Sequence, residues 1–297
     1  MHKMVTDTLY TILVGALNGL TTLPPRLAYG IGERLGDLAY AGLASRRRVT
    51  LDNLALALGE HQSSYARQVM AREVFRHLGR HVVDFAHLRH INAARIQQMC
   101  VNWEEVTYLD ALAARGNGLL IISAHFGSWE LLPALGLLLQ TPTNVIVRPP
   151  DNPLVHRLSE AYRQRCGYRA IGKQQQAIRE SLQALHRQEI VGVLMDQSSV
   201  RSESVEVEFF GIETFTPKGP ALLALRAQCP VVGLFFICEA PGRHRVVVTG
   251  EIPMARTGDV RRDLEENSRR FNGVIETQIR RYPEQWFWLH RRWKKRA

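Results

Sequence analysis

The stretch that decides the fold runs from Gly118 to Glu130 and reads GLLIISAHFGSWE. It opens with an apolar run, residues 118–123, of the kind typical of a strand buried on both faces. A turn containing His125 follows, and the pattern over residues 128–139 then predicts a helix, with Ser128 as its cap. A strand, a turn and a helix in this order indicate an α/β protein, in which sites gather where strands end.

Working outward, short apolar runs alternate with helical patterns as far as the C-terminus. Further strands are predicted at residues 144–147, 190–195, 205–209, 231–237 and 245–248. Further helices are predicted at residues 154–166, 174–186, 217–228 and 260–281, and residues 26–115 are mostly helical in pattern. This alternation predicts an α/β fold with a central, largely parallel mixed sheet flanked by helices.

The N-terminal residues form an apolar segment of a different kind. Between Met4 and Leu23 the only charge is Asp7, and the segment ends at Pro24-Pro25. Its length approaches the ~20 residues that cross a bilayer, but several threonines make it only moderately hydrophobic. We interpret residues 1–25 as a membrane-associating helix that lies in the interface; a spanning helix and a soluble core helix are the alternatives. With no linker or repeat, residues 26–297 are expected to form one domain.

Composition and charge narrow the class of protein. The 297 residues are 45% hydrophobic and 22% charged, which is ordinary for a globular protein and excludes a disordered or collagen-like chain. The net charge is 38 − 28 = +10. Such a charge points to an anionic partner, which could be nucleic acid, an anionic lipid surface or an acidic protein.

The sequence predicts no metal site and no cofactor. The four cysteines, Cys100, Cys166, Cys229 and Cys238, form no CxxC pair, so we expect packing residues in a reducing compartment. His77 and His81 lie one helical turn apart, but no third ligand is fixed by local spacing.

His125 and Glu130 are the candidate catalytic pair. Across a tight turn the two side chains can meet. A carboxylate bonded to one imidazole nitrogen fixes the tautomer and stabilises the imidazolium that forms when the other nitrogen takes a proton. That arrangement suits a general base acting on a hydroxyl. A purely structural hydrogen bond at a helix start is the alternative.

Several motifs together resemble the late lipid A acyltransferases, the lauroyl/myristoyl transferase family. HFGSWE, residues 125–130, resembles the HFGNWE form of that family's HX4(D/E) motif, with Ser128 where the family often has Asn. The other matching blocks, in the family's order, are VRPPDNP at 147–153, Asp196-Gln197, FFG at 209–211, TPKGPA at 216–221 and PEQWFWLHRRWK at 283–294.

The resemblance implies a glycerol-3-phosphate-acyltransferase-like fold and transfer of a fatty acyl chain from acyl carrier protein to a hydroxyl of a lipid A precursor. His125 would deprotonate that hydroxyl with the support of Glu130. No GxSxG nucleophile elbow is present, so we expect no covalent acyl-enzyme.

Other residues of the matching blocks are candidates for contacts with substrate. Arg148 would stabilise the oxyanion or bind a phosphate, with a surface salt bridge as the alternative. Asp196 would orient a basic group or a water, with capping as the alternative. Further candidates for substrate or phosphate binding are Gln197, Lys218, His290, Arg291 and Arg292.

The C-terminal segment mixes basic residues with indoles. Arg291, Arg292, Lys294, Lys295 and Arg296 interleave with Trp286, Trp288 and Trp293. This mixture suits a membrane interface, and core tryptophans under a solvated segment are the alternative.

The expected partners are acyl carrier protein, the lipid A precursor and anionic inner-membrane lipid, at the cytoplasmic face of the bacterial inner membrane. Three other functions stay open at this point. A related enzyme could acylate another glycolipid, such as phosphatidylinositol mannoside. A basic nucleic-acid-binding protein is disfavoured because no binding motif is present, and an inactive scaffold because His125 and Glu130 are both present.

Overall fold

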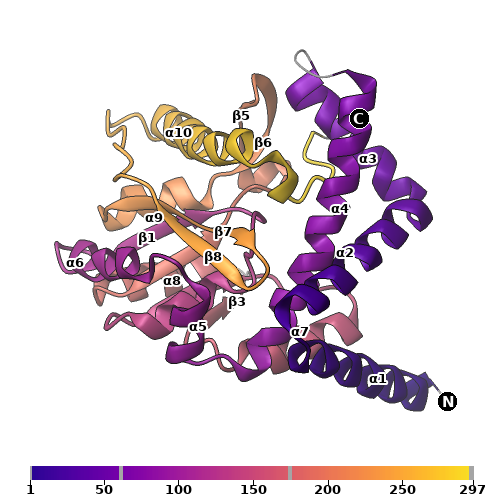
Figure 1. Cartoon of the computed structure of the whole chain (residues 1–297). Helices are drawn as coiled ribbons and strands as arrows, with labels where there is room; N and C mark the ends of the chain where they lie inside the picture. Colours follow the sequence, from indigo (N-terminus) through magenta and orange to yellow (C-terminus); the bar gives the residue numbers. More distant parts are fainter. Residues whose placement is uncertain (1, 60–62, 173–175, 294–297) are drawn as a thin grey trace.

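The computed structural model describes residues 2–59, 63–172 and 176–293 (Figure 1). Its first part is helical, as predicted, and Figure 1 shows the first four helices together on one side of the molecule. These helices are α1 (His2–Thr22), α2 (Pro25–Gly42), α3 (Ala44–Leu58) and α4 (Ser64–His87), and the shorter α5 (Ala93–Met99) and α6 (Tyr108–Ala113) follow.

The remainder is an α/β unit built on a six-stranded sheet. The strand order is β3-β2-β4-β1-β7-β8, and all neighbours pair in parallel except β7 and β8. The strands are β1 (Leu119–Ser123), β2 (Thr143–Val147), β3 (Arg169–Gly172), β4 (Ile190–Leu194), β7 (Val231–Ala240) and β8 (Arg243–Val248). The predicted mixed, largely parallel sheet is confirmed, although the sequence patterns did not predict its edge strand β3.

Helices flank this sheet, and a separate hairpin lies beside it. The helices are α7 (Pro153–Arg163), α8 (Ala177–His186), α9 (Gly219–Ala227) and α10 (Val260–Arg281), close to the predicted ranges, of which residues 174 and 175 lie outside the described part. The hairpin pairs β5 (Ser204–Phe209) with β6 (Ile212–Pro217), a strand that the sequence analysis did not predict.

Strand β1 lies in the interior of the sheet, between β4 and β7. All five of its residues are buried, because both faces of the sheet are covered. Leu119 and Ile121 belong to one hydrophobic cluster, and Leu120 and Ile122 to another. This alternation places one core on each side of the sheet and leaves the end of β1 to present the residues that follow it.

The helix predicted over residues 128–139 is wrong. The chain turns after β1 and continues as a 3-10 helix, η4 (Leu132–Leu138). The left-handed Gly127 (φ +59°) and the Ser128 N–H, which donates to the Phe236 carbonyl, hold the backbone away from α-helical geometry. The Ser128 hydroxyl does not cap a helix but donates to Asp84.

The C-terminal tryptophans are core residues, which corrects their assignment to a membrane interface. Trp286 and Trp288 are 2% and 0% exposed and belong to the core cluster under α10, and the partly buried Trp293 packs against it. Lys294, Lys295 and Arg296 lie outside the described residues.

Helix α1 packs along one side of the molecule. Arg157 of α7 forms an ion pair with Asp7 at 2.6 Å and stacks over Tyr10, and Arg89 donates to Asn18 at 3.2 Å. Among the described residues, no helix combines the length and the apolar character that a membrane crossing requires.

Candidate active site

The turn after β1 is held in place by the C-terminal segment. The Gly127 N–H donates to the Gln285 carbonyl, and the Phe287 N–H donates to the His125 carbonyl, both at 2.9 Å. Residues 285–287 therefore run beside the turn and fix the position of His125, although they follow it by about 160 residues in the sequence.

His125 is bonded to Asp196. Its Nδ1 lies 2.8 Å from Asp196 Oδ1, and the other carboxylate oxygen accepts a hydrogen bond from Trp286 Nε1 at 2.8 Å. Asp196 follows β4, the neighbour of β1, so the carboxyl ends of two adjacent parallel strands bring the pair together. The basic group that we expected Asp196 to orient is therefore His125.

The electrostatics of this pair favour an imidazole that can take a second proton. Burial by itself lowers the pKa of His125, but the charge and hydrogen bond of Asp196 outweigh it and raise that pKa above its usual value. Burial opposes ionisation of Asp196, yet His125 and Trp286 hold the pKa of the carboxyl below its usual range. Because an ionised carboxylate only accepts, the proton of neutral His125 sits on Nδ1 and Nε2 carries the lone pair. Gln197 Nε2 lies 3.4 Å from that nitrogen.

Glu130 is engaged elsewhere, in contrast to the expected bond with His125. Both of its oxygens bind Arg163, at 2.6 and 2.9 Å. Burial raises the pKa of Glu130, but Arg163 lowers it below its usual value overall. Glu130 acts on the imidazole through space, since its charge raises the pKa of His125 and that of Arg163 lowers it. Sequence reasoning missed Arg163, which lies on α7 with no local motif around it.

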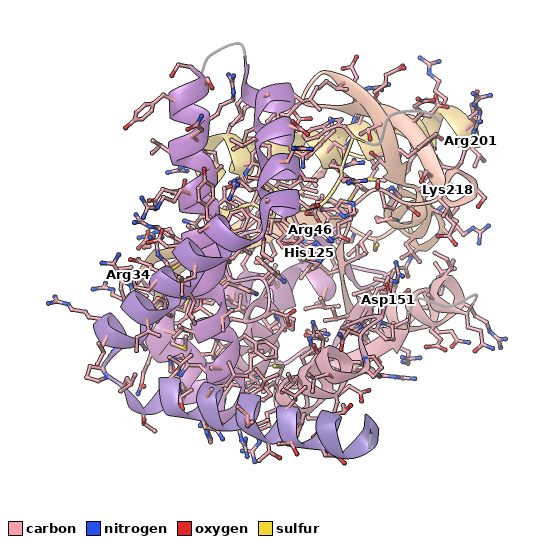
Figure 2. The ribbon with its side chains drawn as sticks, turned by 90° about the vertical axis from the view of Figure 1, so that its right-hand side faces the viewer. Arg34, Arg46, His125, Asp151, Arg201 and Lys218 are labelled. Carbon is pink, nitrogen blue, oxygen red and sulfur yellow. The ribbon has the colours of Figure 1, made fainter. Side chains whose placement is uncertain are left out.

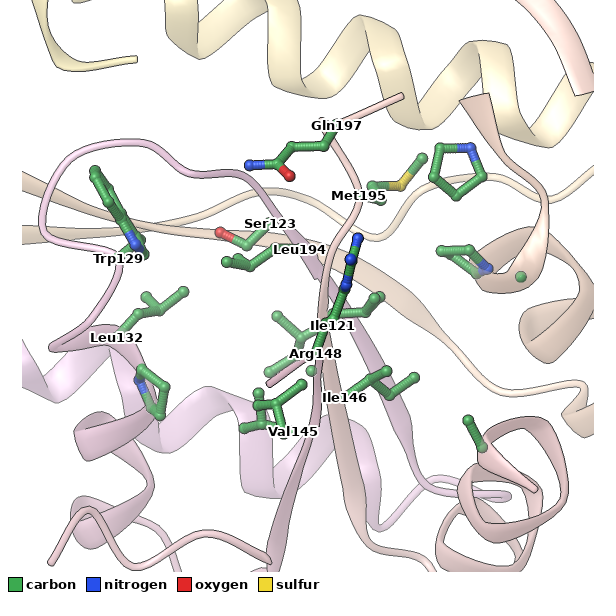
Figure 3. Close-up of a pocket in the computed structure, with 18 of the residues that line it drawn as sticks. Ile121, Ser123, Trp129, Leu132, Val145, Ile146, Arg148, Leu194, Met195 and Gln197 are labelled. Atoms are coloured by element: carbon green, nitrogen blue, oxygen red, sulfur yellow. The ribbon is translucent and has the colours of Figure 1, made fainter. Parts of the chain in front are cut away.

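These groups line a cavity of about 620 Å³. Its polar lining includes His125, Glu130 and Gln197, and Figure 3 shows Gln197 across the cavity from the aliphatic side chains of Val145 and Ile146. The apolar lining includes Leu132 and Leu135 of η4, Leu139 directly after it, Ile121 of β1 and Leu234 of β7. The cavity thus places the His125 imidazole beside largely apolar walls.

Comparison with known proteins decides the family. The sequence profile described as "Bacterial lipid A biosynthesis acyltransferase" matches residues 2–295. The chain belongs to this family. The acyltransferase is 28% identical to the lipid A biosynthesis palmitoleoyltransferase of Escherichia coli K12, over 92% of this chain and 87% of the relative. It is 27% identical to the lipid A biosynthesis lauroyltransferase of the same organism, over 95% and 90% of the two chains.

Family membership confirms the resemblance read from the motifs and establishes an acyltransferase of lipid A biosynthesis. It favours lipid A over another glycolipid or nucleic acid as the molecule on which the chain acts.

Two basic residues of the matching blocks lie at the cavity of the acyltransferase. Arg148 lines it, with a side chain that is 69% exposed and an ion pair to Asp151 at 3.0 Å. Lys218 also lines it and donates to the Ser202 carbonyl at 2.8 Å. Viewed from the side of α2 and α3, Figure 2 shows Asp151 and Lys218 on the same side of His125.

His290, Arg291 and Arg292 of the C-terminal block lie in three different surroundings. His290 Nε2 lies 3.3 Å from the N–H of Ser198, a cavity residue next to Gln197. Arg291 is exposed and is not part of the cavity lining. Arg292 is 0% exposed and donates to the Phe215 carbonyl and the Thr216 hydroxyl. Its assignment to substrate binding is therefore wrong, since every reachable partner is a core group.

Histidines 77 and 81 both contact the turn that follows β1. His77 Nε2 contacts the Gly127 carbonyl at 3.3 Å, and the His81 ring stacks on Trp129 at 3.5 Å. Burial lowers the pKa of His77 to about 3 and that of His81 to about 4, so both rings stay neutral.

Among the described residues, Asp84, Cys238 and His244 form one buried group whose potential ligand atoms lie close enough together to bind a metal ion. Asp84 accepts hydrogen bonds from Tyr29, from Ser128 at 2.6 Å and from His244 at 3.2 Å. The protein itself thus satisfies this carboxylate, and through Ser128 the group helps to hold the turn that carries His125. All four cysteines are free and buried, which confirms their packing role.

Proposed function

We propose that the acyltransferase moves a fatty acyl chain from acyl carrier protein to a hydroxyl of a lipid A precursor, with His125 as general base. The observation that carries the proposal is the hydrogen bond between His125 Nδ1 and Asp196, with His125 in the wall of a largely apolar cavity. The imidazole suits a reacting hydroxyl and thioester, and the apolar walls suit an acyl chain.

The step is a direct transfer. Nε2 of His125 takes the hydroxyl proton while the hydroxyl oxygen attacks the thioester carbonyl carbon. The tetrahedral intermediate then collapses, the carbon–sulfur bond breaks, and the imidazolium returns its proton to the leaving thiolate. Asp196 orients the ring and stabilises the imidazolium, and Glu130 supports it with a second negative charge. No covalent acyl-enzyme forms.

Basic groups at the cavity are proposed to bind the anionic parts of the substrates. Arg148 is exposed at the cavity and would stabilise the oxyanion or hold a phosphate, and Lys218 would share the phosphate. Gln197 and His290 would orient the acceptor, and Arg291 would contribute charge nearby. The net charge of +10 favours an acidic carrier protein as donor.

We further propose that the protein works at the cytoplasmic face of the inner membrane, where α1 lies in the interface among anionic lipids. The exposed side chains of Leu9, Ile12 and Leu13 support this placement.

We also propose a fold like that of the glycerol-3-phosphate acyltransferases, which the largely parallel sheet with a histidine turn after β1 supports.

A transfer assay tests the reaction. Purified protein is incubated with acyl carrier protein carrying lauroyl, palmitoleoyl or palmitoyl chains and a Kdo-bearing tetraacyl lipid A precursor. Mass spectrometry is expected to find one added acyl chain, and acyl-coenzyme A is expected to serve poorly. Faster transfer from coenzyme A would overturn the donor, and no product from folded protein would overturn the reaction.

A further inference from the structure

Helix α2 packs against α4 through glycines and through Tyr29 and Tyr40, while its leucines and isoleucine belong to none of the hydrophobic clusters. Gly32 and Gly36 of α2 face Gly79 and the backbone of Phe75, so closely that a Cβ built on Gly79 would lie 1.8 Å from the Gly32 carbonyl oxygen. Such contact between backbones requires small residues on the shared face. The leucines and isoleucine of α2 must therefore point elsewhere.

These side chains form an exposed stripe along α2. Leu27, Ile31, Leu35 and Leu38 are 53%, 36%, 48% and 68% exposed, and their spacing of four, four and three residues puts them on one side of the helix. Single exposed leucines are ordinary, but an aligned set of four marks an interaction surface. We call these four residues the outer stripe of α2.

The charges around the outer stripe identify what it contacts. The acidic residues of α2 are already paired with α4, Glu33 with Arg80 at 2.7 Å and Asp37 with Arg76 at 2.8 Å. Asp37 is also paired with Arg72 at 2.7 Å and with Arg34 at 3.7 Å, and the Arg34 side chain is 81% exposed and borders the stripe. The surface therefore presents aliphatic chains beside an exposed arginine, and the carboxylates of α2 are all paired with arginines.

Helix α1 extends this surface. It carries exposed Leu9, Ile12 and Leu13 and is joined to α2 at Pro24-Pro25. Figures 1 and 2 both show α1 and α2 on the same side of the molecule. An amphipathic helix with aliphatic residues next to exposed arginine is the type that lies flat in the headgroup region of an anionic bilayer.

We propose that α2 docks on an anionic lipid bilayer through its outer stripe, so that the membrane contact includes α2 as well as α1. This inference rests on the membrane association proposed above, which invokes α1 alone, and does not depend on the chemistry at His125. The aliphatic composition favours lipid over a protein partner, because protein interfaces are enriched in aromatic residues.

Site-specific labelling tests the proposal directly. All four native cysteines are buried, so a cysteine introduced by Leu38→Cys is labelled selectively with an environment-sensitive fluorophore. The matched control is Val260→Cys at the start of α10, where the side chain is 63% exposed against 68% for Leu38. Vesicles contain equal parts of phosphatidylcholine and phosphatidylglycerol, with or without brominated acyl chains.

The expected result is a blue shift and bromine quenching for the label at position 38, with no change at position 260. If the protein sediments with vesicles while the label at position 38 does not respond, α1 docks alone and the inference is overturned, although the proposed membrane association survives. If the protein does not sediment with vesicles, both fail.

Partitioning of unlabelled variants gives a second readout. Ile31→Ser/Leu38→Ser is expected to bind these vesicles about tenfold more weakly than wild type, because two aliphatic side chains no longer leave water. Val260→Ser should bind as wild type, and thermal unfolding should match in all three proteins. Unchanged partitioning of the double variant, or equal loss in the control, would overturn the proposal.

Discussion

The Asp196 carboxylate sets the protonation pattern of the His125 ring and raises its pKa. It accepts a hydrogen bond from Nδ1–H and so leaves the lone pair on Nε2, while a second hydrogen bond from Trp286 holds the carboxylate in place. A serine-dependent hydrolase uses a similar imidazole–carboxylate pair to activate its own nucleophile. In the mechanism proposed here the substrate hydroxyl takes that place, because the sequence contains no nucleophile elbow.

Asp196→Asn should lower kcat/KM by roughly 10²–10⁴-fold, because the imidazole loses its orientation and the charge that stabilises its protonated form. In the proposed mechanism the neutral imidazole is the active base, so activity should rise with pH through the pKa of His125. Without the Asp196 charge this pKa falls, and the acidic limb of the pH profile should move to lower pH. An acidic limb at the same pH in Asp196→Asn and wild type would show that Asp196 does not raise the pKa of His125.

Glu130 and Arg163 should shift that limb in opposite directions. Glu130 raises the pKa of His125 and Arg163 lowers it, so the limb should move down in Glu130→Ala and up in Arg163→Ala. Each single change also leaves one partly buried charge unpaired, and because both side chains keep some contact with water the cost in the free energy of unfolding should stay below the ~3–5 kcal/mol of a fully buried pair. Stability is measured by urea unfolding, and the double variant should regain part of it. If the acidic limb shifts in the same direction in both variants, the charges of Glu130 and Arg163 do not set the pKa of His125.

The buried inner strands and the His125 turn could be predicted from the sequence, whereas strands β3 and β6 and the backbone that follows the turn could not. Strand β1 and the first eight residues of β7 are continuous apolar runs because they are buried on both faces, and a local pattern reveals this directly. The residues after β1 carry a helical pattern, but hydrogen bonds to Phe236 and Gln285 override it. Such long-range contacts leave no local signal.

The candidate site shows the same division. The position of His125 at the end of a buried strand followed from the sequence, but its partner did not, because Glu130 was nearer in the chain. Asp196 lies 71 residues away and depends on β1 and β4 being neighbours in the sheet. Arg292 was assigned to substrate binding and the tryptophans to a membrane interface for a related reason. A basic, aromatic segment has the same sequence pattern whether it lies at a surface or in a core.

The glycine contact between α2 and α4 should be intolerant of any side chain. Gly79→Ala places a methyl group against the Gly32 carbonyl and should destabilise the fold by about 1–3 kcal/mol, measured by urea unfolding. The matched control is Gly30→Ala in α2, where a Cβ meets no atom within 4 Å. That change should stabilise the helix by about 0.5–1 kcal/mol. Equal effects would show that the two helices are not in close contact.

The buried pair of His244 and Asp84 should make the whole molecule sensitive to alkali. Burial lowers the pKa of His244, but Asp84 outweighs it and raises the pKa to about 10. An unfolded histidine titrates near ~6.5, so the pair stabilises the fold fully below that pH and loses this contribution as pH rises toward 10.

The free energy of unfolding should therefore fall by up to about 1.4 kcal/mol per pH unit over that interval, measured by denaturant titration at several pH values. In His244→Gln the pH dependence should flatten. A stability that rises with pH in wild type would contradict the assignment of a charged His244.

At the scale of the molecule, the helices α1–α4 form one side and the sheet with its cavity forms the rest (Figure 1). We propose that catalysis in this arrangement depends on one imidazole, that of His125. The most direct test is the turnover of His125→Ala with acyl carrier protein as donor, beside His156→Ala, which removes a half-exposed histidine of α7. His125→Ala should lose at least about 10²–10⁴-fold in kcat with unchanged thermal unfolding, and His156→Ala should keep wild-type activity. Turnover of His125→Ala close to that of wild type would contradict the account.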